Sequence, residues 1–343
     1  MSIRSKKRLA SVLVSVSSLI IIIFSQEIAD GITQGIKICF NSIIPSLYIF
    51  TILCIFIVKT KIFNDNIIIN ILSKLLFGTD AKLGTIYFLS LFCGYPIGAK
   101  LCNQLYLDNQ ISKSEANKLL YFCINPGPAF LITFVGQSIY NNKSIGLIIF
   151  GATFVSVIIG ARVLKIKCSN NYTYYDDIKI TDDLIYSINS ANKSMLSICS
   201  WIIISCSIIN ILNADKILSI ISYFIEVTSG IINASENYSI YFIAFLIGFG
   251  GISVHMQVLS CSKDIKPKYV NILFFKIIQG FSTSLITFVF LKLLPINVNV
   301  SYVFSLSNSQ NNSIISFTTL IFFIISSIIF MNKKCRNKET NMI

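Results

Sequence analysis

The sequence is poor in charge, since only 13% of its 343 residues are Asp, Glu, Lys or Arg. An ordinary soluble domain carries about 25%. Because 54% of the residues are hydrophobic and the mean hydropathy is +0.73, the chain has too little polar surface to fold in water. This composition excludes a disordered chain, a coiled coil, a small disulfide scaffold and a nucleic-acid-binding domain. It predicts a protein whose solvent is lipid.

The motifs of several enzyme and metal-site classes are also missing. The chain has ten cysteines but no Cys-x-x-Cys pair, and its one histidine is His255, so the usual spacing of a zinc or iron–sulfur site is absent. The cysteines lie mostly in apolar runs, where we expect small buried apolar side chains. Without a Walker A loop or a pair of intramembrane acids, we expect no catalytic residue, no metal, no cofactor and no enzymatic activity.

The positive charge gathers beside apolar runs. The net charge is +13, and basic residues cluster at 4–8 and at 333–338. Such clusters are typical of the cytoplasmic flanks of membrane spans and of contact with anionic lipid headgroups. The partner that they indicate is therefore the lipid bilayer and not nucleic acid.

The apolar runs predict an all-α polytopic membrane protein with roughly eight to ten helical segments. Ser112 and Glu115 have the spacing of a helix start. The expected units are an N-terminal anchor helix with an amphipathic lead-in (1–32), a first repeat (33–164), a polar connector (165–183), a second repeat (184–331) and a basic tail (332–343).

The two predicted repeats are related by a shift of about 153 residues. Gly98 then falls on Gly251, Gln104 on Gln257 and Gly127 on Gly280. Internal repeats of this kind build many secondary transporters, often in inverted orientation. The pattern therefore predicts two structural repeats with a polar cavity at their interface.

Three stretches of glycine and proline interrupt the apolar runs: the first at 94–98, the second at 248–251 and the third at 125–128. Proline removes a backbone donor and glycine weakens a helix. Free backbone groups in hydrocarbon cost several kcal/mol each, so such breaks must be buried in protein or line a polar cavity. The third stretch, at 125–128, is either a second unwound segment or a tight surface turn. The expected break residues are Gly94, Pro96, Gly98, Pro126, Gly127, Pro128, Gly250 and Gly251.

Polar side chains at or near these breaks are the candidate solute ligands. A lysine at membrane depth costs about 3 kcal/mol, so Lys100 either contacts solute or extends to the interface. Gln104 and Gln257 either face one cavity from two sides or join helices. Ser253 and His255 are two residues apart, so on a helix they do not form a catalytic pair. The candidate solute-binding residues are Lys100, Gln104, Asn125, Ser253, His255 and Gln257.

Four strings together resemble a known family: residues 94–100 (GYPIGAK), 112–115, 125–128 and 250–257 (GGISVHMQ). They are similar to the YlbJ-type sporulation integral membrane proteins, within the nucleoside-recognition (Gate) domain membrane proteins, over roughly 33–331. The resemblance implies a multi-pass protein in the mother-cell or forespore membranes of an endospore-forming bacterium, with a permease-like fold and re-entrant helices. The breaks lack the acidic ligands of nucleoside transporters in the wider group, so nucleoside is not the expected cargo.

Taken together, these features predict a permease-like protein that binds or transports a small polar solute during formation of the spore envelope, including its cortex. The alternative is a non-transporting membrane scaffold or partner-binding protein of spore assembly. Either protein is compatible with a homo-oligomer or with other sporulation membrane proteins as partners.

Overall fold

The structure is a computed structural model that describes residues 17–60, 67–166, 180–212 and 219–294, with Ser11, Val14, Ser15 and Ile296 as isolated positions. The apolar run at 313–331, the basic tail at 332–343 and most of the connector at 165–183 lie outside these residues. The regular structure within the described ranges is entirely helical. The prediction of an all-α fold is therefore confirmed.

Four helical segments are long and apolar enough to cross a membrane: α8 (Lys143–Leu164), α9 (Ile180–Leu212), α12 with α13 (Ile240–Cys261) and α14 (Tyr269–Leu293). Two bent pairs raise the number of candidate spans to as many as six. Ser17–Ile23 meets Ser25–Asn41 at 89°, and α4 meets α5 at 77°. The chain is a multi-pass membrane protein, as its composition predicts.

The breaks divide the described chain into more and shorter helices than expected. α2 continues without interruption across residue 32, where the anchor unit was expected to end. The other elements are α2 (Ser25–Ile38), η1 (Cys39–Ile43), α3 (Ile44–Thr60), α4 (Ile67–Leu76), α5 (Ala81–Cys93), α6 (Ile97–Leu107), α7 (Lys113–Leu120), η2 (Phe130–Ile139), α10 (Ser219–Ile225), α11 (Val227–Ser235), α12 (Ile240–Phe249) and α13 (Gly251–Cys261).

Local chemistry fixes several of these helix starts. The Ser112 hydroxyl accepts a hydrogen bond from the Glu115 amide at 3.3 Å, and the Glu115 carboxylate accepts one from the Ser112 amide at 2.7 Å. This capping box satisfies two amides that have no partner inside the helix, so α7 begins where Ser112 and Glu115 predict. Asp80 caps α5 in a similar way by accepting from the Leu83 amide at 3.1 Å.

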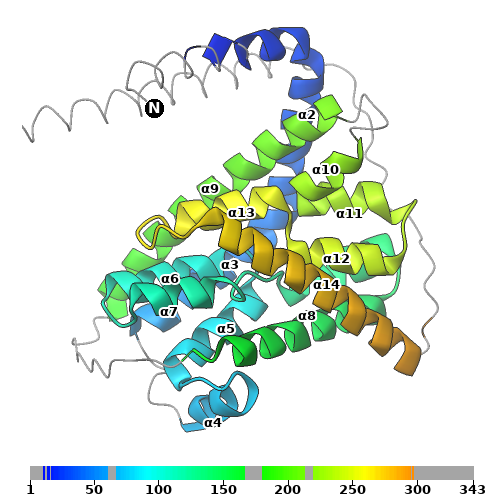
Figure 1. Cartoon of the computed structure of the whole chain (residues 1–343). Coiled ribbons are helices and arrows are strands. Elements are labelled where there is room, and N and C mark those ends of the chain that lie inside the picture. Colours follow the sequence, from blue (N-terminus) through cyan, green and yellow to red (C-terminus); the bar gives the residue numbers. More distant parts are fainter. Residues whose placement is uncertain are drawn as a thin grey trace, which may run out of the picture.

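The helices surround a large apolar core to which both predicted repeats contribute, and a smaller apolar cluster lies between α2, η1 and α9. α14 lies beside α12 and α8 on one side of the core, while α9 and α2 cover another side (Figure 1). The short helices α6, α7, α10, α11 and α13 lie between these longer ones. The helix breaks that these short helices adjoin are therefore inside the protein and shielded from lipid.

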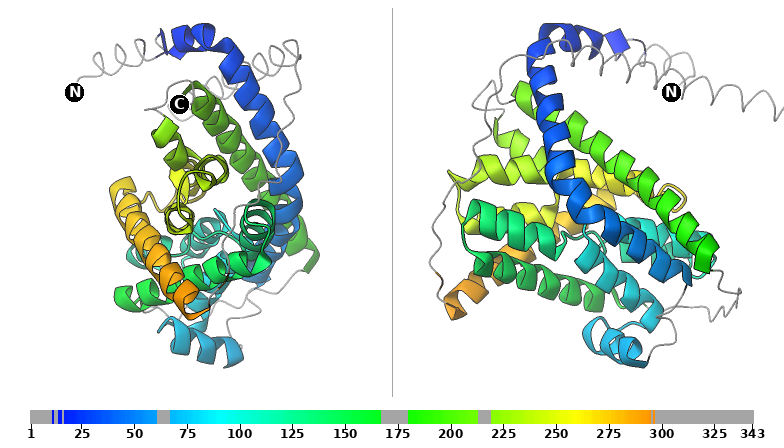
Figure 2. Two further views of the ribbon diagram at one scale, coloured as in Figure 1. Left: turned by 90° about the vertical axis from the view of Figure 1, so that its right-hand side faces the viewer. Right: turned by 180° about the vertical axis from the view of Figure 1, so that it is seen from behind.

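Close packing of α2 on α9 depends on two glycines one helical turn apart. A Cβ atom on Gly31 would lie 2.5 Å from the Cα of Ser207, and one on Gly35 would lie 2.7 Å from the Cα of Ile203. Small residues at this spacing let membrane helices approach closely and gain van der Waals contact. Figure 2 shows the result, with α2 lying along α9.

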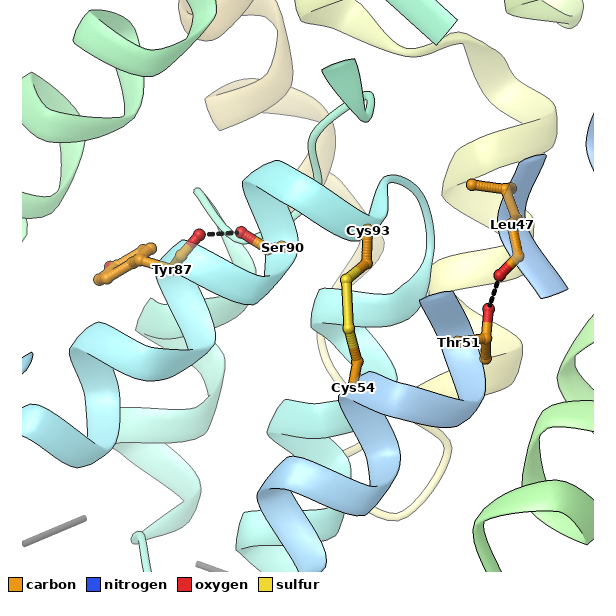
Figure 3. The surroundings of a disulfide bond; sticks show 6 residues. All are labelled: Leu47, Thr51, Cys54, Tyr87, Ser90 and Cys93. Atoms are coloured by element: carbon orange, nitrogen blue, oxygen red, sulfur yellow. Dashed lines mark hydrogen bonds between the residues drawn. A yellow bond between two sulfur atoms is a disulfide. The ribbon is translucent and has the colours of Figure 1, made fainter. Parts of the chain in front are cut away.

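A disulfide joins Cys54 of α3 to Cys93, the last residue of α5 (Figure 3). The expectation of small buried apolar cysteines in the apolar runs is therefore wrong at these two positions, which are paired. They are 39 residues apart in sequence, and only the packing of α3 against α5 brings them together. The remaining cysteines that the structure describes are free: Cys39, Cys102, Cys123, Cys199, Cys206 and Cys261.

Replacing Gly35 by leucine should separate α2 from α9, because the new side chain has no space beside Ile203. We expect Gly35→Leu to lower the free energy of unfolding by about 1–3 kcal/mol, the usual cost of overpacking. The unfolding temperature of the purified chain in lipid nanodiscs measures this loss. Thr33→Leu, at an exposed position of the same helix, is the control. A Gly35→Leu protein as stable as this control would contradict the glycine packing.

Candidate functional site

The first and third predicted breaks pack against each other through their backbones. Gly94 has a φ of +78°, which a residue with a side chain rarely adopts. A Cβ atom on Gly94 would lie 3.1 Å from the amide nitrogen of Gly127, and one on Gly127 would lie 3.2 Å from the carbonyl oxygen of Phe92. The stretch at 125–128 is thus part of the protein interior and not a surface turn.

The second predicted break packs against a fourth one. Gly250 and Gly251 have φ values of +85° and +76°. A Cβ atom on Gly251 would lie 3.1 Å from the amide nitrogen of Val227 and 3.2 Å from the carbonyl oxygen of Ile225. The chain bends there at Glu226, between α10 and α11. This break was not expected, because neither proline nor glycine flanks Glu226.

Glu226 corrects the expectation that the breaks contain no acidic residue. Its side chain is only 2% exposed. The two carboxylate oxygens accept hydrogen bonds from the amides of Thr228 at 3.0 Å and Ser229 at 2.7 Å. Glu226 is therefore the N-cap of α11, and its charge interacts favourably with the positive end of the helix dipole.

The carbonyl groups at the breaks are satisfied by side chains, several of them from the opposite half of the chain. The Tyr95 hydroxyl, beside the first break, donates to the carbonyl oxygen of Ile247 on α12 at 2.7 Å. Lys276 of α14 donates to the carbonyl oxygen of Ile124, beside the third break, at 2.8 Å. Buried backbone groups without partners are costly in a membrane, so these bonds stabilise the broken conformation.

Lys276 belongs to a buried polar network. It is completely buried, and its ammonium also donates to the Gln279 amide oxygen at 2.7 Å. Gln279 in turn donates to the Asn125 amide oxygen at 2.7 Å, and Asn125 donates to the Ser90 hydroxyl at 3.2 Å. The network connects α14 to the third break and to α5, and therefore joins the two halves of the chain.

A cavity of about 50 Å³ lies where the breaks meet. This volume has room for a few water molecules. Its walls are mostly apolar, but Glu226, Thr228 and Gln257 contribute polar side chains. The residues that line it are Ile43, Leu47, Gly94, Tyr95, Pro126, Gly127, Phe130, Ile198, Ile202, Glu226, Val227, Thr228, Val254 and Gln257.

Gln257 is the one candidate solute ligand from the sequence that lines this cavity. Ser253 lies next to it and accepts a hydrogen bond from the Gln257 amide at 3.4 Å. Asn125 is fully buried in the network described above. A ring nitrogen of His255, Nε2, pairs with the carbonyl oxygen of Phe249 at 2.9 Å, so the histidine contacts the end of α12.

Lys100 and Gln104 face α9 and do not line the cavity. The Lys100 ammonium donates to the carbonyl oxygen of Ser190 and to the hydroxyl of Ser194. The Gln104 amide oxygen accepts from the Tyr186 hydroxyl at 2.7 Å. Gln104 and Gln257 occupy corresponding positions in the two halves of the sequence, but only Gln257 lines the cavity.

Two predicted break residues have other roles. Gly98 is inside α6 and not in the break, because the helix begins at Ile97. A Cβ atom on Gly98 would lie 1.9 Å from the carbonyl oxygen of Cys123, so this glycine permits close packing of α6. Pro128 is the first residue of the helical segment that leads into η2, a position where proline is well tolerated.

Glu226, Lys276 and Gln279 were not predicted as site residues. Each is a buried polar residue in an otherwise apolar run, and intramembrane polar residues of this kind often mark functional positions. That signal was present in the sequence. Among the residues that the structure describes, no group of three or more His, Cys, Asp or Glu side chains is arranged to hold a metal ion.

Removing the Lys276 ammonium should destabilise the protein. Lys276→Met keeps the length of the side chain but leaves the Ile124 carbonyl and the Gln279 amide oxygen without a donor, at a cost of about 1–3 kcal/mol for each group. Relief of the buried charge offsets part of this cost, so we expect a net loss of about 2 kcal/mol. Thermal unfolding in nanodiscs measures it, with the exposed Lys292→Met on the same helix as control. Equal stability of the two variants would contradict a bracing role.

Comparison with known proteins gives one weak similarity. No family model and no solved structure matches the chain. A stretch of 122 residues is 26% identical to the sporulation integral membrane protein YlbJ of Bacillus subtilis (strain 168). This stretch covers 35% of the present chain and 30% of that protein. The chain is thus similar to part of a sporulation membrane protein, and its own fold is that of a multi-pass helical membrane protein.

Proposed function

We propose that the chain binds a small polar solute in the cavity between its helix breaks and moves it across a membrane without an ATPase of its own. The observation that carries this proposal is a cavity where the breaks meet. Gly94, Gly127 and Glu226, from three of the four breaks, line it together with the polar residues Thr228 and Gln257. Irregular backbone is tolerated at membrane depth where it is buried in protein or lines a cavity. Broken helices around a central site are typical of secondary transporters.

Contacts between the halves support two structural repeats. Tyr95 bonds to Ile247, 152 residues later, and Asn125 bonds to Gln279, 154 residues later. These separations match the shift of about 153 residues that aligns the halves. Where two repeats are related by a two-fold axis, a residue that touches its own equivalent lies close to that axis. The breaks would therefore surround a pseudo-two-fold axis, the position where repeat transporters bind solute.

Similarity to part of YlbJ supports a role in sporulation. The proposed location is the mother-cell or forespore membrane of an endospore former, and the proposed setting is formation of the spore envelope, including the cortex. We propose binding and transfer of the solute without catalysis. His255 and Ser253 already make hydrogen bonds to Phe249 and Gln257, and these bonds are structural ones.

Replacing Gln257 by leucine tests this function. The substitution removes a polar group from the cavity wall, which should weaken solute binding by roughly tenfold if one strong hydrogen bond is lost. Each variant is expressed in an endospore former that lacks its own copy of the gene. We expect Gln257→Leu to give severalfold fewer heat-resistant spores than wild type at equal abundance in the membrane.

Gln104→Leu is the matched control, because Gln104 occupies the corresponding place in the first half but faces α9. It should leave spore numbers close to those of wild type. Normal spore numbers with Gln257→Leu would contradict solute binding in this cavity and favour the non-transporting scaffold. A loss in the Gln104 variant alone would contradict it equally, since that residue lies outside the cavity.

A further inference from the structure

The cavity contains a buried carboxylate without a matching positive charge. Glu226 is 2% exposed and lines the cavity. In the described part of the chain, no Lys, Arg or His nitrogen forms an ion pair with it.

Helix dipoles do not replace the missing charge. The positive end of α11 favours the Glu226 carboxylate, but the negative end of α10 also adjoins it, so the helix dipoles compensate less than one unit of charge. The two amides of α11 hydrogen-bond to the carboxylate but carry no net charge. An ionised carboxylate without a cationic partner is strongly disfavoured in a region of low dielectric.

The lysine that is fully buried in the described residues is bound elsewhere. A Cβ atom on Gly250 would lie 3.7 Å from the Cε atom of Lys276. The Lys276 ammonium donates to the Ile124 carbonyl and to Gln279, both of which are neutral.

We propose that Glu226, Thr228 and Gln257 form a site for a small monovalent cation, either an alkali metal ion or the ammonium group of an organic solute. All three line the cavity, and they offer one carboxylate and two neutral side-chain oxygens, the ligand type that hard cations prefer. A divalent ion usually takes several carboxylates, and this cavity supplies one. Within the proposed function, the cation would be the coupling ion or part of the solute.

Cation-dependent stability of the full-length chain in lipid nanodiscs tests the site. The probes are NaCl, KCl and methylammonium chloride, each replacing N-methyl-D-glucamine chloride at constant ionic strength. The glucamine cation is too large for a cavity of about 50 Å³. We expect at least one small cation to raise the unfolding temperature of the wild-type chain in a saturable way. A response to Na⁺ or K⁺ indicates a metal ion, and a response to methylammonium alone indicates an organic amine.

Glu226→Gln should abolish this rise, because the amide carries no charge. Glu236→Gln is the matched control, since Glu236 is exposed at the opposite end of α11, and it should keep the wild-type response. If Glu226→Gln does not fold, Thr228→Val is the second test. We expect it to raise severalfold the cation concentration that gives half of the maximal rise in unfolding temperature. The proposal is overturned by a wild-type chain that responds to none of the three cations, by a Glu226→Gln protein with the wild-type response, or by an unchanged half-saturation in Thr228→Val.

This experiment is independent of the spore assay, although the use of the cation rests on the proposed function. If the wild-type chain responds to a cation but Gln257→Leu gives normal spore numbers, the ion site is supported and the solute proposal is contradicted. If Gln257→Leu lowers spore numbers but the wild-type chain responds to no cation, the solute proposal is supported and the ion site is contradicted.

Discussion

The structure depends on one constraint, which is that backbone groups freed by a helix break inside a membrane protein cannot turn to water. The described part of this chain has four such breaks, and side chains satisfy much of their hydrogen bonding. Glu226 accepts hydrogen bonds from two amides of α11. Tyr95 donates to a carbonyl group near the end of α12, and Lys276 donates to the carbonyl group of Ile124. Because two of these side chains come from the opposite half, neither half can form its breaks correctly without the other.

The same constraint explains why polar residues are concentrated at the centre of so apolar a protein. Asn125, Gln279 and Lys276 form one connected network, and such a network is stable only when each member has its partners. Glycines at the breaks serve a different purpose, since they let two backbones meet without side chains between them. The cavity is what remains where the backbones meet incompletely. The few polar residues in its walls are thus a consequence of how the breaks are stabilised.

The sequence predicts the fold class and much of the break geometry because glycine, proline and apolar runs act locally. Gly94 and Gly250 are at breaks for that reason. Glu226 was missed because no glycine or proline marks its break, although an acidic residue in an apolar run was itself a signal. Lys100 was chosen for its nearness in sequence to Gly94, but the lysine at the breaks is Lys276, carried there by α14. The Cys54–Cys93 pair likewise depends on how α3 meets α5.

The close fit of α2 on α9 also has a consequence for how the protein is made. Ile28 and Ser207, which meet at this contact, are 179 residues apart in the chain. At a synthesis rate of about 5–20 residues per second, the glycine face of α2 is complete roughly 10–35 seconds before its partner emerges from the ribosome. During that interval lipid, the translocon or a chaperone must cover Gly31 and Gly35. α2 is therefore made before α9 and receives this permanent neighbour only after the whole first half has been made.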